Sequence, residues 1–294
     1  MKVLYIIPLF LLLLLSCHDE DTIKAELQAG KYVITDDPND PVQHFIYNFY
    51  QKYGVVILTN PDSSDYVYNF DKPNLIRVTP PKQDKQLLET GLQYLSEVFF
   101  DIYDDSFKKS YFPFTVQMAD QISGFVIDWY EPQNIYANTG LIVVANINEE
   151  LSSLDEETKH INRGEINAAL WCNHLLPREA WRVRSAFYEP SKDYYDEFAF
   201  DSYTVEEGII EAREAGFISF DPNSDTEDPE DCFLYIPSKE TDVLLFIQFI
   251  FSSTQEEVEE LMEEYPIIEE KYKILQASIK EYMNIDIFMF CIPS

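Results

Sequence analysis

The stretch KQDKQLLETGLQYLSEVFFDIYD, residues 82–104, decides how the first half of the chain is organised. Its apolar side chains recur at spacings of four and three residues, which places them on one face of an α-helix. They are Leu88, Leu92, Leu95, Phe99 and Ile102. Strand-like runs flank this helix at 55–58, 66–70, 75–78, 114–118, 125–129 and 141–147, and a short helix is expected over 42–52. Residues 41–150 are therefore predicted to be mixed α/β.

Residues 151–294 are expected to be mainly helical. Asn162, followed three residues later by Glu165, is similar to a capping box and predicts a helix that ends before Pro177. The run 243–251 is apolar nearly all round and predicts a buried helix. Two more helices are expected over 256–264 and 268–282. The predicted fold class is α+β, with residues 41–294 forming a single domain.

The composition excludes several kinds of protein. The chain has 294 residues, of which 53 are acidic and 21 basic, giving a formal net charge of −32. A chain this acidic repels phosphate, which argues against a nucleic-acid partner. The 46% of hydrophobic residues is too high for a disordered acidic tail. Only four histidines are present, so a histidine-based metal site has few candidate ligands.

The first residues form a targeting signal. Lys2 precedes the apolar run 3–15, which is too short to cross a bilayer as a helix. The run ends in Leu-Leu-Ser-Cys, which resembles a bacterial lipoprotein signal with its lipobox. This resemblance implies cleavage of residues 1–16 and lipidation of Cys17. The alternatives are an ordinary secretory signal and a buried N-terminal helix.

The acidic residues after Cys17 suggest where the protein is anchored. HDED, residues 18–21, is similar to the surface-export signal of Bacteroidetes lipoproteins. We therefore expect an outer-membrane lipoprotein on the cell surface, with a periplasmic orientation as the alternative. Residues 17–40 are predicted to be an acidic tether. Cys172 and Cys291 lie in apolar stretches and are expected to be small core residues.

Four stretches of the chain, taken in order, resemble one family. It comprises the substrate import-associated zinc metallohydrolase lipoproteins of Bacteroidetes, a group of zinc metallopeptidases. The stretches are 45–56 (FIYNFYQKYGVV), 78–114, 211–220 (EAREAGFISF) and 267–286. The resemblance implies a zincin-like metallopeptidase fold. It also implies partners in nutrient import, namely a TonB-dependent transporter and a SusD-like glycan-binding lipoprotein.

The catalytic motif of that family is degraded here. The family uses His-Glu-x-x-His, in which two histidines bind zinc and the glutamate activates the zinc-bound water. The equivalent helix reads ALWCNHLL, residues 169–176. Leu170 stands at the first histidine position and Trp171 at the glutamate position, so only His174 matches. The third ligand position falls at Leu234, within the stretch EDCFL, 230–234.

These replacements remove two ligands and the general base together. Leu170 cannot bind a metal and Trp171 cannot accept a proton, whereas a hydrolytic zinc site needs three protein ligands and a water. The sequence therefore predicts a catalytically inactive binding or accessory protein without a cofactor. In this prediction His174 is a hydrogen-bonded core residue. The alternatives are an active zinc metallohydrolase with displaced ligands around His174, such as His160 and a carboxylate, and a purely structural lipoprotein.

Three weaker features leave both a structural and a functional interpretation open. Glu230 and Asp231 could begin a helix, where acidic residues are favoured. The loop 221–228 could bind calcium, although a solvated loop is the preferred interpretation. The pairs Trp129–Tyr130 and Tyr194–Tyr195 could stack on sugar rings, whereas most aromatic residues are expected to fill the core.

Overall fold

The computed structural model describes residues 32–67, 76–126 and 129–293. Its contacts divide the chain into two compact units, residues 1–35 and 36–294. The second unit holds every helix and strand named below. Within the described part of the chain, none of the helices combines the length and apolar character that crossing a membrane requires. The predicted signal sequence, residues 1–16, and Cys17 lie outside the described residues.

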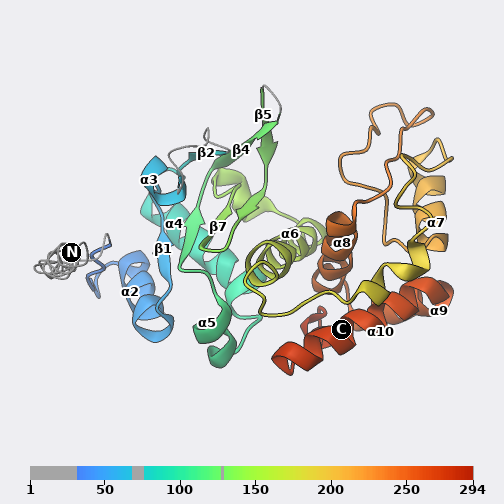
Figure 1. Cartoon of the computed structure of the whole chain (residues 1–294). Helices are drawn as coiled ribbons and strands as arrows, with labels where there is room; N and C mark the ends of the chain where they lie inside the picture. The colour runs from blue at the N-terminus through green and yellow to red at the C-terminus, as the bar shows by residue number, and fades with distance from the viewer. Residues whose placement is uncertain (1–31, 68–75, 127–128, 294) are drawn as a thin grey trace, which may run out of the picture. The chain divides into compact units, whose positions relative to one another are not determined.

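Two small sheets form the first half of this unit (Figure 1). The first has the order β1-β3-β7-β6, where β1, β3 and β7 are parallel and β6 is an antiparallel edge strand. The second has the antiparallel order β2-β4-β5. The strands are β1 (Val56–Leu58), β2 (Ile76–Thr79), β3 (Thr115–Met118), β4 (Gln121–Val126), β5 (Trp129–Gln133), β6 (Ile135–Ala137) and β7 (Leu141–Val144).

Strand β7 is buried on both faces, which explains its continuous run of apolar residues. Ile142 and Val144 belong to the main core cluster with the helices. Leu141 and Val143 face the other way and pack in a second cluster with residues of β2 and β4. The alternation of side chains along the strand therefore joins the two sheets and the helical core.

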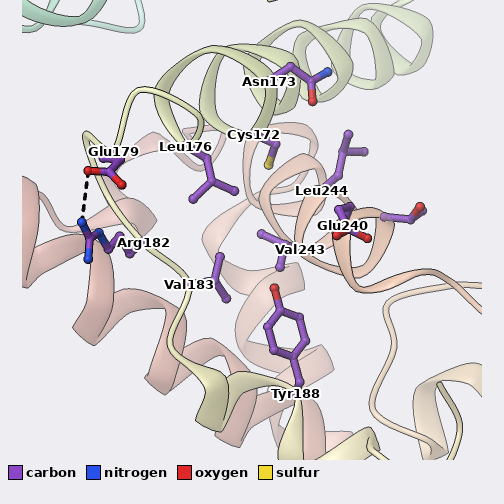
Figure 2. Close-up of a pocket in the computed structure, with 11 residues that line it drawn as sticks. Cys172, Asn173, Leu176, Glu179, Arg182, Val183, Tyr188, Glu240, Val243 and Leu244 are labelled. Atoms are coloured by element: carbon purple, nitrogen blue, oxygen red, sulfur yellow. Dashed lines mark hydrogen bonds and ion pairs between the residues drawn. The ribbon is translucent and has the colours of Figure 1, made fainter. Parts of the chain in front are cut away.

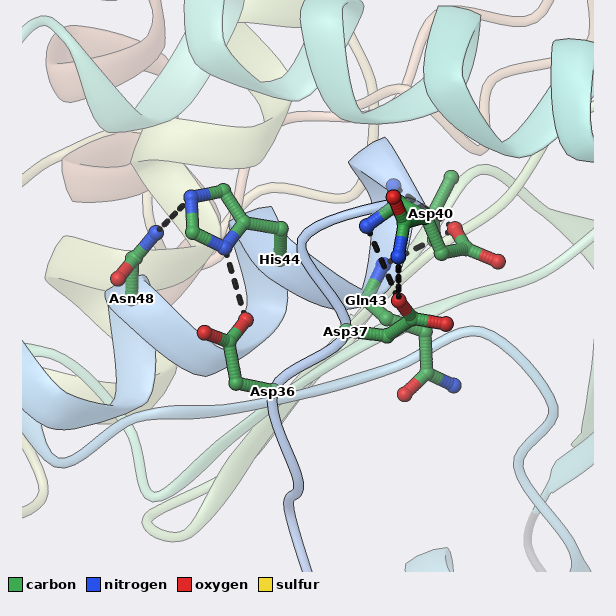
Figure 3. A network of polar contacts seen from close by, with 8 residues as sticks. Asp36, Asp37, Asp40, Gln43, His44 and Asn48 are labelled. Carbon is green, nitrogen blue, oxygen red and sulfur yellow. Dashed lines mark hydrogen bonds and ion pairs between the residues drawn. The ribbon is translucent and has the colours of Figure 1, made fainter.

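Helix α2 (Pro41–Tyr53) shows how the compact unit begins. The Asp40 side chain accepts hydrogen bonds from two backbone N–H groups of the first turn and so caps the helix. The ring of His44 contacts Asp36 through Nδ1 at 2.8 Å and Asn48 through Nε2 at 3.0 Å (Figure 3). Both nitrogen atoms of His44 are therefore engaged within this N-terminal network.

The remaining helices are α3 (Ser63–Tyr66), α4 (Lys85–Leu95), α5 (Asp105–Tyr111), α6 (Glu156–Ala168), α7 (Val205–Glu214), α8 (Lys239–Ser252), α9 (Gln255–Glu264) and α10 (Pro266–Met283). Helices α4 and α6 each continue into a π-helical segment, 96–100 and 169–175. Helices α6 and α8 approach closely at Gly164, where an added Cβ atom would lie 2.9 Å from the Gln248 carbonyl oxygen. Any larger side chain at Gly164 would force these two helices apart.

The predicted α+β class is confirmed, with mixed structure in the first half and mainly helices in the second. The predicted strand 125–129 is wrong, because Val126 ends β4 and Trp129 begins β5; only residues 127–128 separate the two strands. The predicted strand 66–70 is wrong at Tyr66, which ends α3, whereas 68–70 lie outside the described residues. Neither predicted strand contains a Gly or Pro, so nothing in the pattern marked the boundary inside it.

The predicted cap at Asn162 is also wrong. Helix α6 begins at Glu156, and the side chain of Asp155 accepts a hydrogen bond from the backbone N–H of Thr158. The first two turns of α6 are largely polar and either exposed or half-buried, so they lack the apolar repeat that would have indicated a helix. Helix α6 therefore begins several residues before its apolar repeat does.

Candidate functional site

Three positions that the resemblance aligns with the metal-binding motif lie on the π-helical continuation of α6. Leu170, Trp171 and His174 are all 0% exposed. Leu170 and Trp171 belong to the main core cluster, in which the Trp171 ring packs against Trp181, Phe107 and other aromatic rings. This segment is therefore part of a continuous apolar core.

The indole of Trp171 takes part in a buried chain of neutral hydrogen bonds. Its Nε1–H donates to the hydroxyl oxygen of Tyr103 at 3.0 Å, and the Tyr103 hydroxyl donates to Oδ1 of Asn167 at 2.7 Å. The Asn167 amide in turn donates to the Val98 carbonyl at 3.0 Å. Burial raises the pKa of Tyr103 well above its usual value, which keeps the hydroxyl protonated. We call Trp171, Tyr103 and Asn167 the neutral centre.

Both ring nitrogen atoms of His174 are used inside the protein. Nδ1 lies 3.0 Å from the carbonyl oxygen of Asn138, and Nε2 lies 2.8 Å from Nη1 of Arg178. A carbonyl only accepts and a guanidinium only donates, so we infer that Nδ1 carries the proton and Nε2 accepts. Burial lowers the pKa of His174, which favours this neutral form. Neither nitrogen atom offers a free lone pair to a metal ion.

The residues around His174 do not supply a displaced metal site. Glu165 accepts a hydrogen bond from the Asn134 amide at 3.0 Å, and burial raises the pKa of this carboxyl group. His160 lies two turns earlier than Asn167 on the more exposed part of α6. Among the residues the structure describes, no three His, Cys, Asp or Glu side chains converge on a point that could hold a metal ion. The side chains present therefore do not fit zinc.

Leu234, which the resemblance places at the third-ligand position, belongs to a different part of the core. It is 0% exposed and packs in a small cluster with Phe200, Phe217, Cys232 and two alanines of the α7 region. Leu170 and Trp171 belong to the main cluster instead. Leu170, Trp171 and Leu234 therefore belong to two separate apolar clusters.

The acidic pair next to Leu234 does not begin a helix. Glu230 and Asp231 are exposed and lie in a turn, in which the Asp228 side chain accepts a hydrogen bond from the Glu230 backbone N–H. The following helix, α8, begins only at Lys239 and is capped by Ser238. The helix-start interpretation of this pair is wrong because the turn already satisfies its backbone groups.

A pocket of about 600 Å³ opens beside the π-helical segment (Figure 2). Its apolar wall comprises Cys172, Leu176, Val183, Val243 and Leu244. The hydroxyl of Tyr188 points into it, Glu240 stands at one side, and the ion pair of Arg182 with Glu179 at 3.1 Å stands at the other. Such a pocket can bind a small molecule with an apolar body and a polar end.

The pocket does not contain an activated nucleophile. Burial raises the pKa of the Cys172 thiol far above its usual value, so the reactive thiolate does not form. Burial, assisted by the negative charge of Asp242, likewise raises the pKa of Tyr188 and keeps its hydroxyl neutral. Neither Cys172 nor Tyr188 is therefore ionised for attack on a bound molecule.

The structure also contains a buried ion pair that the sequence analysis missed. Nζ of Lys271 lies 2.7 Å from Oδ2 of Asp242, and both side chains are 0% exposed. Nζ also donates to the Gly216 carbonyl at 2.8 Å, and the Tyr195 hydroxyl donates to the same carboxylate oxygen. Burial raises the pKa of Asp242 and lowers that of Lys271, while their mutual attraction opposes both shifts. We call Asp242, Lys271 and Tyr195 the charged centre.

A signal for this pair was present in the sequence. Lys271 lies three residues after Ile268 and four before Leu275, which places a charge on the apolar stripe of α10. Three aromatic rings surround its ammonium group, with Nζ 4.6–4.8 Å from the ring centroids. They belong to Phe187, Phe217 and Phe246. The carboxylate that completes the site could not be assigned, since Asp242 resembles an ordinary residue of a first helical turn.

The other sequence candidates lie apart from one another and do not form a common site among the described residues. The guanidinium carbon of Arg77 lies 3.7 Å from the centroid of the Tyr130 ring. The side chain of Trp129 lies outside the described residues. Tyr194 is 38% exposed, while Tyr195 belongs to the charged centre. In the loop 221–228 the Asp221 and Asp225 side chains accept hydrogen bonds from loop backbone N–H groups.

Comparison with known proteins gives a distant likeness in fold. No family model matches the chain, and no curated protein matches it. Among solved structures it is similar to "a putative zinc-binding metallo-peptidase from Bacteroides caccae", with a TM-score of 0.48 and 12% identity over 88% of this chain and 92% of that one. At this identity the likeness assigns no role to any residue.

Proposed function

We propose that this chain is a lipid-anchored outer-membrane protein of zincin-like fold that has no catalytic zinc centre and acts by binding. In this proposal it is an accessory component of a nutrient-import system with a TonB-dependent transporter and a SusD-like lipoprotein. One observation supports the absence of a catalytic zinc centre: Nδ1 of His174 is hydrogen-bonded to Asn138 and Nε2 to Arg178. A zinc ligand needs an unengaged lone pair.

Metal analysis of the purified protein tests the loss of the zinc centre. We expect well below one zinc per chain after incubation with zinc and removal of the excess, and no peptide hydrolysis that a chelator abolishes. The Arg178→Met variant removes the hydrogen bond to Nε2 without touching the core, and we expect it to remain free of zinc because Leu170 and Trp171 add no ligand.

The matched variants His174→Gln and His160→Gln complete this test. Stoichiometric zinc that His174→Gln alone abolishes, together with chelator-sensitive hydrolysis, would establish the alternative of a metallohydrolase with displaced ligands. Zinc that survives both substitutions would instead indicate a surface site unrelated to the motif.

The proposed anchor and partners need tests in cells. We expect a palmitate analogue to label the wild-type protein and not the Cys17→Ser variant, since lipidation requires that thiol. External protease should degrade a surface-exposed protein in intact cells. Purification from solubilised outer membranes should recover a TonB-dependent transporter and a SusD-like protein. Recovery of neither would favour a purely structural lipoprotein.

A further inference from the structure

Three aromatic side chains form a cluster at the surface. One comes from the segment before α7, and the other two come from the segment between α7 and α8. Phe198, Phe233 and Tyr235 have ring centroids 5.2–5.7 Å from one another, and we call them the aromatic trio. Phe198 is 72% exposed and Phe233 is 47% exposed. Clusters of water-exposed rings are typical of interaction sites, because an aromatic ring is more stable when it is buried away from water.

The backbone holds the aromatic trio in place. Segment 232–236 pairs on one side with 198–203, where the Phe200 N–H donates to the Leu234 carbonyl at 2.9 Å. On its other side, Phe233 and Asp225 exchange two backbone hydrogen bonds of 2.8 and 3.0 Å. Side chains alternate along this strand-like segment, so Cys232 and Leu234 are buried while Phe233 points outward. The rings therefore project from a fixed platform.

The surroundings of the aromatic trio are strongly negative. Residues 193–236, all of which the structure describes, include 14 acidic residues and a single basic one, Arg213. Exposed acidic pairs lie just before two of the rings: Asp196 with Glu197 directly precedes Phe198, and Glu230 with Asp231 is separated from Phe233 by Cys232 alone. No carboxylate of this segment forms an ion pair with a lysine or arginine among the described residues.

We propose that the aromatic trio and its acidic surroundings dock a basic, arginine- or lysine-bearing segment of a partner protein. Cations bind over aromatic faces, and an arginine can also form paired hydrogen bonds with a carboxylate. A neutral sugar would use the rings but would gain little from the concentrated negative charge. This inference rests on the proposed role in binding and supplies its site and the chemistry of the partner.

A fluorescent peptide provides the probe. Binding of acetyl-(Gly-Arg)₆ to the full-length protein is measured by fluorescence anisotropy at low salt, with acetyl-(Gly-Glu)₆ as the charge control. We expect binding of the arginine peptide only, weakening as salt screens the charges. The double variant Phe198→Ala/Phe233→Ala should weaken it about five-fold or more, from the loss of two cation–π contacts. These side chains lie outside the core, so the fold should survive.

Two controls separate this site from non-specific attraction by an acidic protein. Tyr282→Ala removes a ring that is 46% exposed on α10, and Glu259→Gln/Glu260→Gln removes two exposed charges from α9. Asp196→Asn/Glu230→Gln removes two charges beside the trio. We expect the last variant to weaken binding several-fold more than either control. Equal effects of all three would overturn the proposal.

The remaining outcomes are also decisive. Retention of neutral polysaccharides in affinity gels, lost in Phe198→Ala/Phe233→Ala while the arginine peptide still binds, would identify a sugar-binding platform and overturn the proposal. Zinc content measured on the same samples reports on the catalytic question alone. A failure of peptide docking is therefore distinguishable from a failure of the proposed function.

Discussion

The neutral centre and the charged centre both place polar side chains inside the core, but the first pairs them by uncharged hydrogen bonds and the second by an ion pair. Each buries polar groups completely, one around Trp171 and Tyr103 and the other around Lys271 and Asp242. In the neutral centre every contact is an uncharged hydrogen bond, so no ion loses its hydration. In the charged centre an ammonium and a carboxylate are removed from water, and Oδ1 of Asp242 has no hydrogen-bond partner among the described residues.

The difference teaches where this fold is most sensitive to substitution. Neutral hydrogen bonds contribute on the order of 1 kcal/mol each, although a buried donor left unpaired costs more. A buried charge without its partner costs several kcal/mol, whereas replacing the whole pair by apolar residues is often tolerated. A single substitution should therefore lower the free energy of unfolding more in the charged centre than in the neutral centre. Replacing both charged residues together should cost less than replacing one of them.

The largest effect is expected from Asp242→Asn. This change leaves the Lys271 ammonium buried without a counter-charge, and we expect a loss of about 3–5 kcal/mol in the free energy of unfolding, measured by urea denaturation. Glu269→Gln is the matched control, because Glu269 pairs with Lys273 on the same helix but in solvent; it should cost less than about 0.5 kcal/mol. Equal losses in the two variants would mean that Lys271 reaches water.

The double variant Asp242→Leu/Lys271→Met should recover at least half of the stability lost in Asp242→Asn. Both ions are then absent, and the apolar side chains pack among Phe187, Phe217 and Phe246. Recovery is incomplete because the Gly216 carbonyl loses its donor. The same denaturation curves provide the measurement. A double variant less stable than Asp242→Asn would show that the pair itself is strongly stabilising.

A smaller effect is expected in the neutral centre from Tyr103→Phe. The substitution leaves the Trp171 N–H without its acceptor and Asn167 Oδ1 without its donor, at a cost of about 1–3 kcal/mol. Tyr282→Phe removes a hydroxyl from an exposed ring and should leave the free energy of unfolding nearly unchanged. If Tyr103→Phe destabilised more than Asp242→Asn, the ranking of the two centres would be reversed.

The smallest effect concerns the pH dependence of His174, which lies beside the neutral centre. Burial lowers its pKa below 6.5 in the folded protein, so the unfolded chain takes up the proton first as the pH falls. The stability that neutral His174 contributes is complete above pH 6.5 and is lost as the pH falls toward the folded pKa. Between pH 7 and 5.5 we expect wild type to lose more stability than His174→Gln, by at most about 1 kcal/mol. Parallel stability curves would contradict this burial.

Much of the fold could be predicted because it depends on local periodicity. The stripe of Leu88, Leu92 and Leu95 and the apolar run of α8 both predicted helices that the structure contains. The division between β4 and β5 was not predicted, since no Gly or Pro stands between Val126 and Trp129 to mark it. The exposed start of α6 could not be predicted either, because its residues do not repeat an apolar pattern.

The candidate site also has features that the sequence predicts and features that only the folded chain shows. The sequence alone determined that Leu170, Trp171 and Leu234 carry no metal-binding or proton-accepting group, because that property belongs to each side chain by itself. Only the tertiary structure decided how His174 is hydrogen-bonded, that Lys271 meets Asp242, and that rings distant in sequence gather in the aromatic trio. Apart from the contact of His174 with Arg178, these features join segments tens of residues apart, and such contacts exist only once the chain has folded.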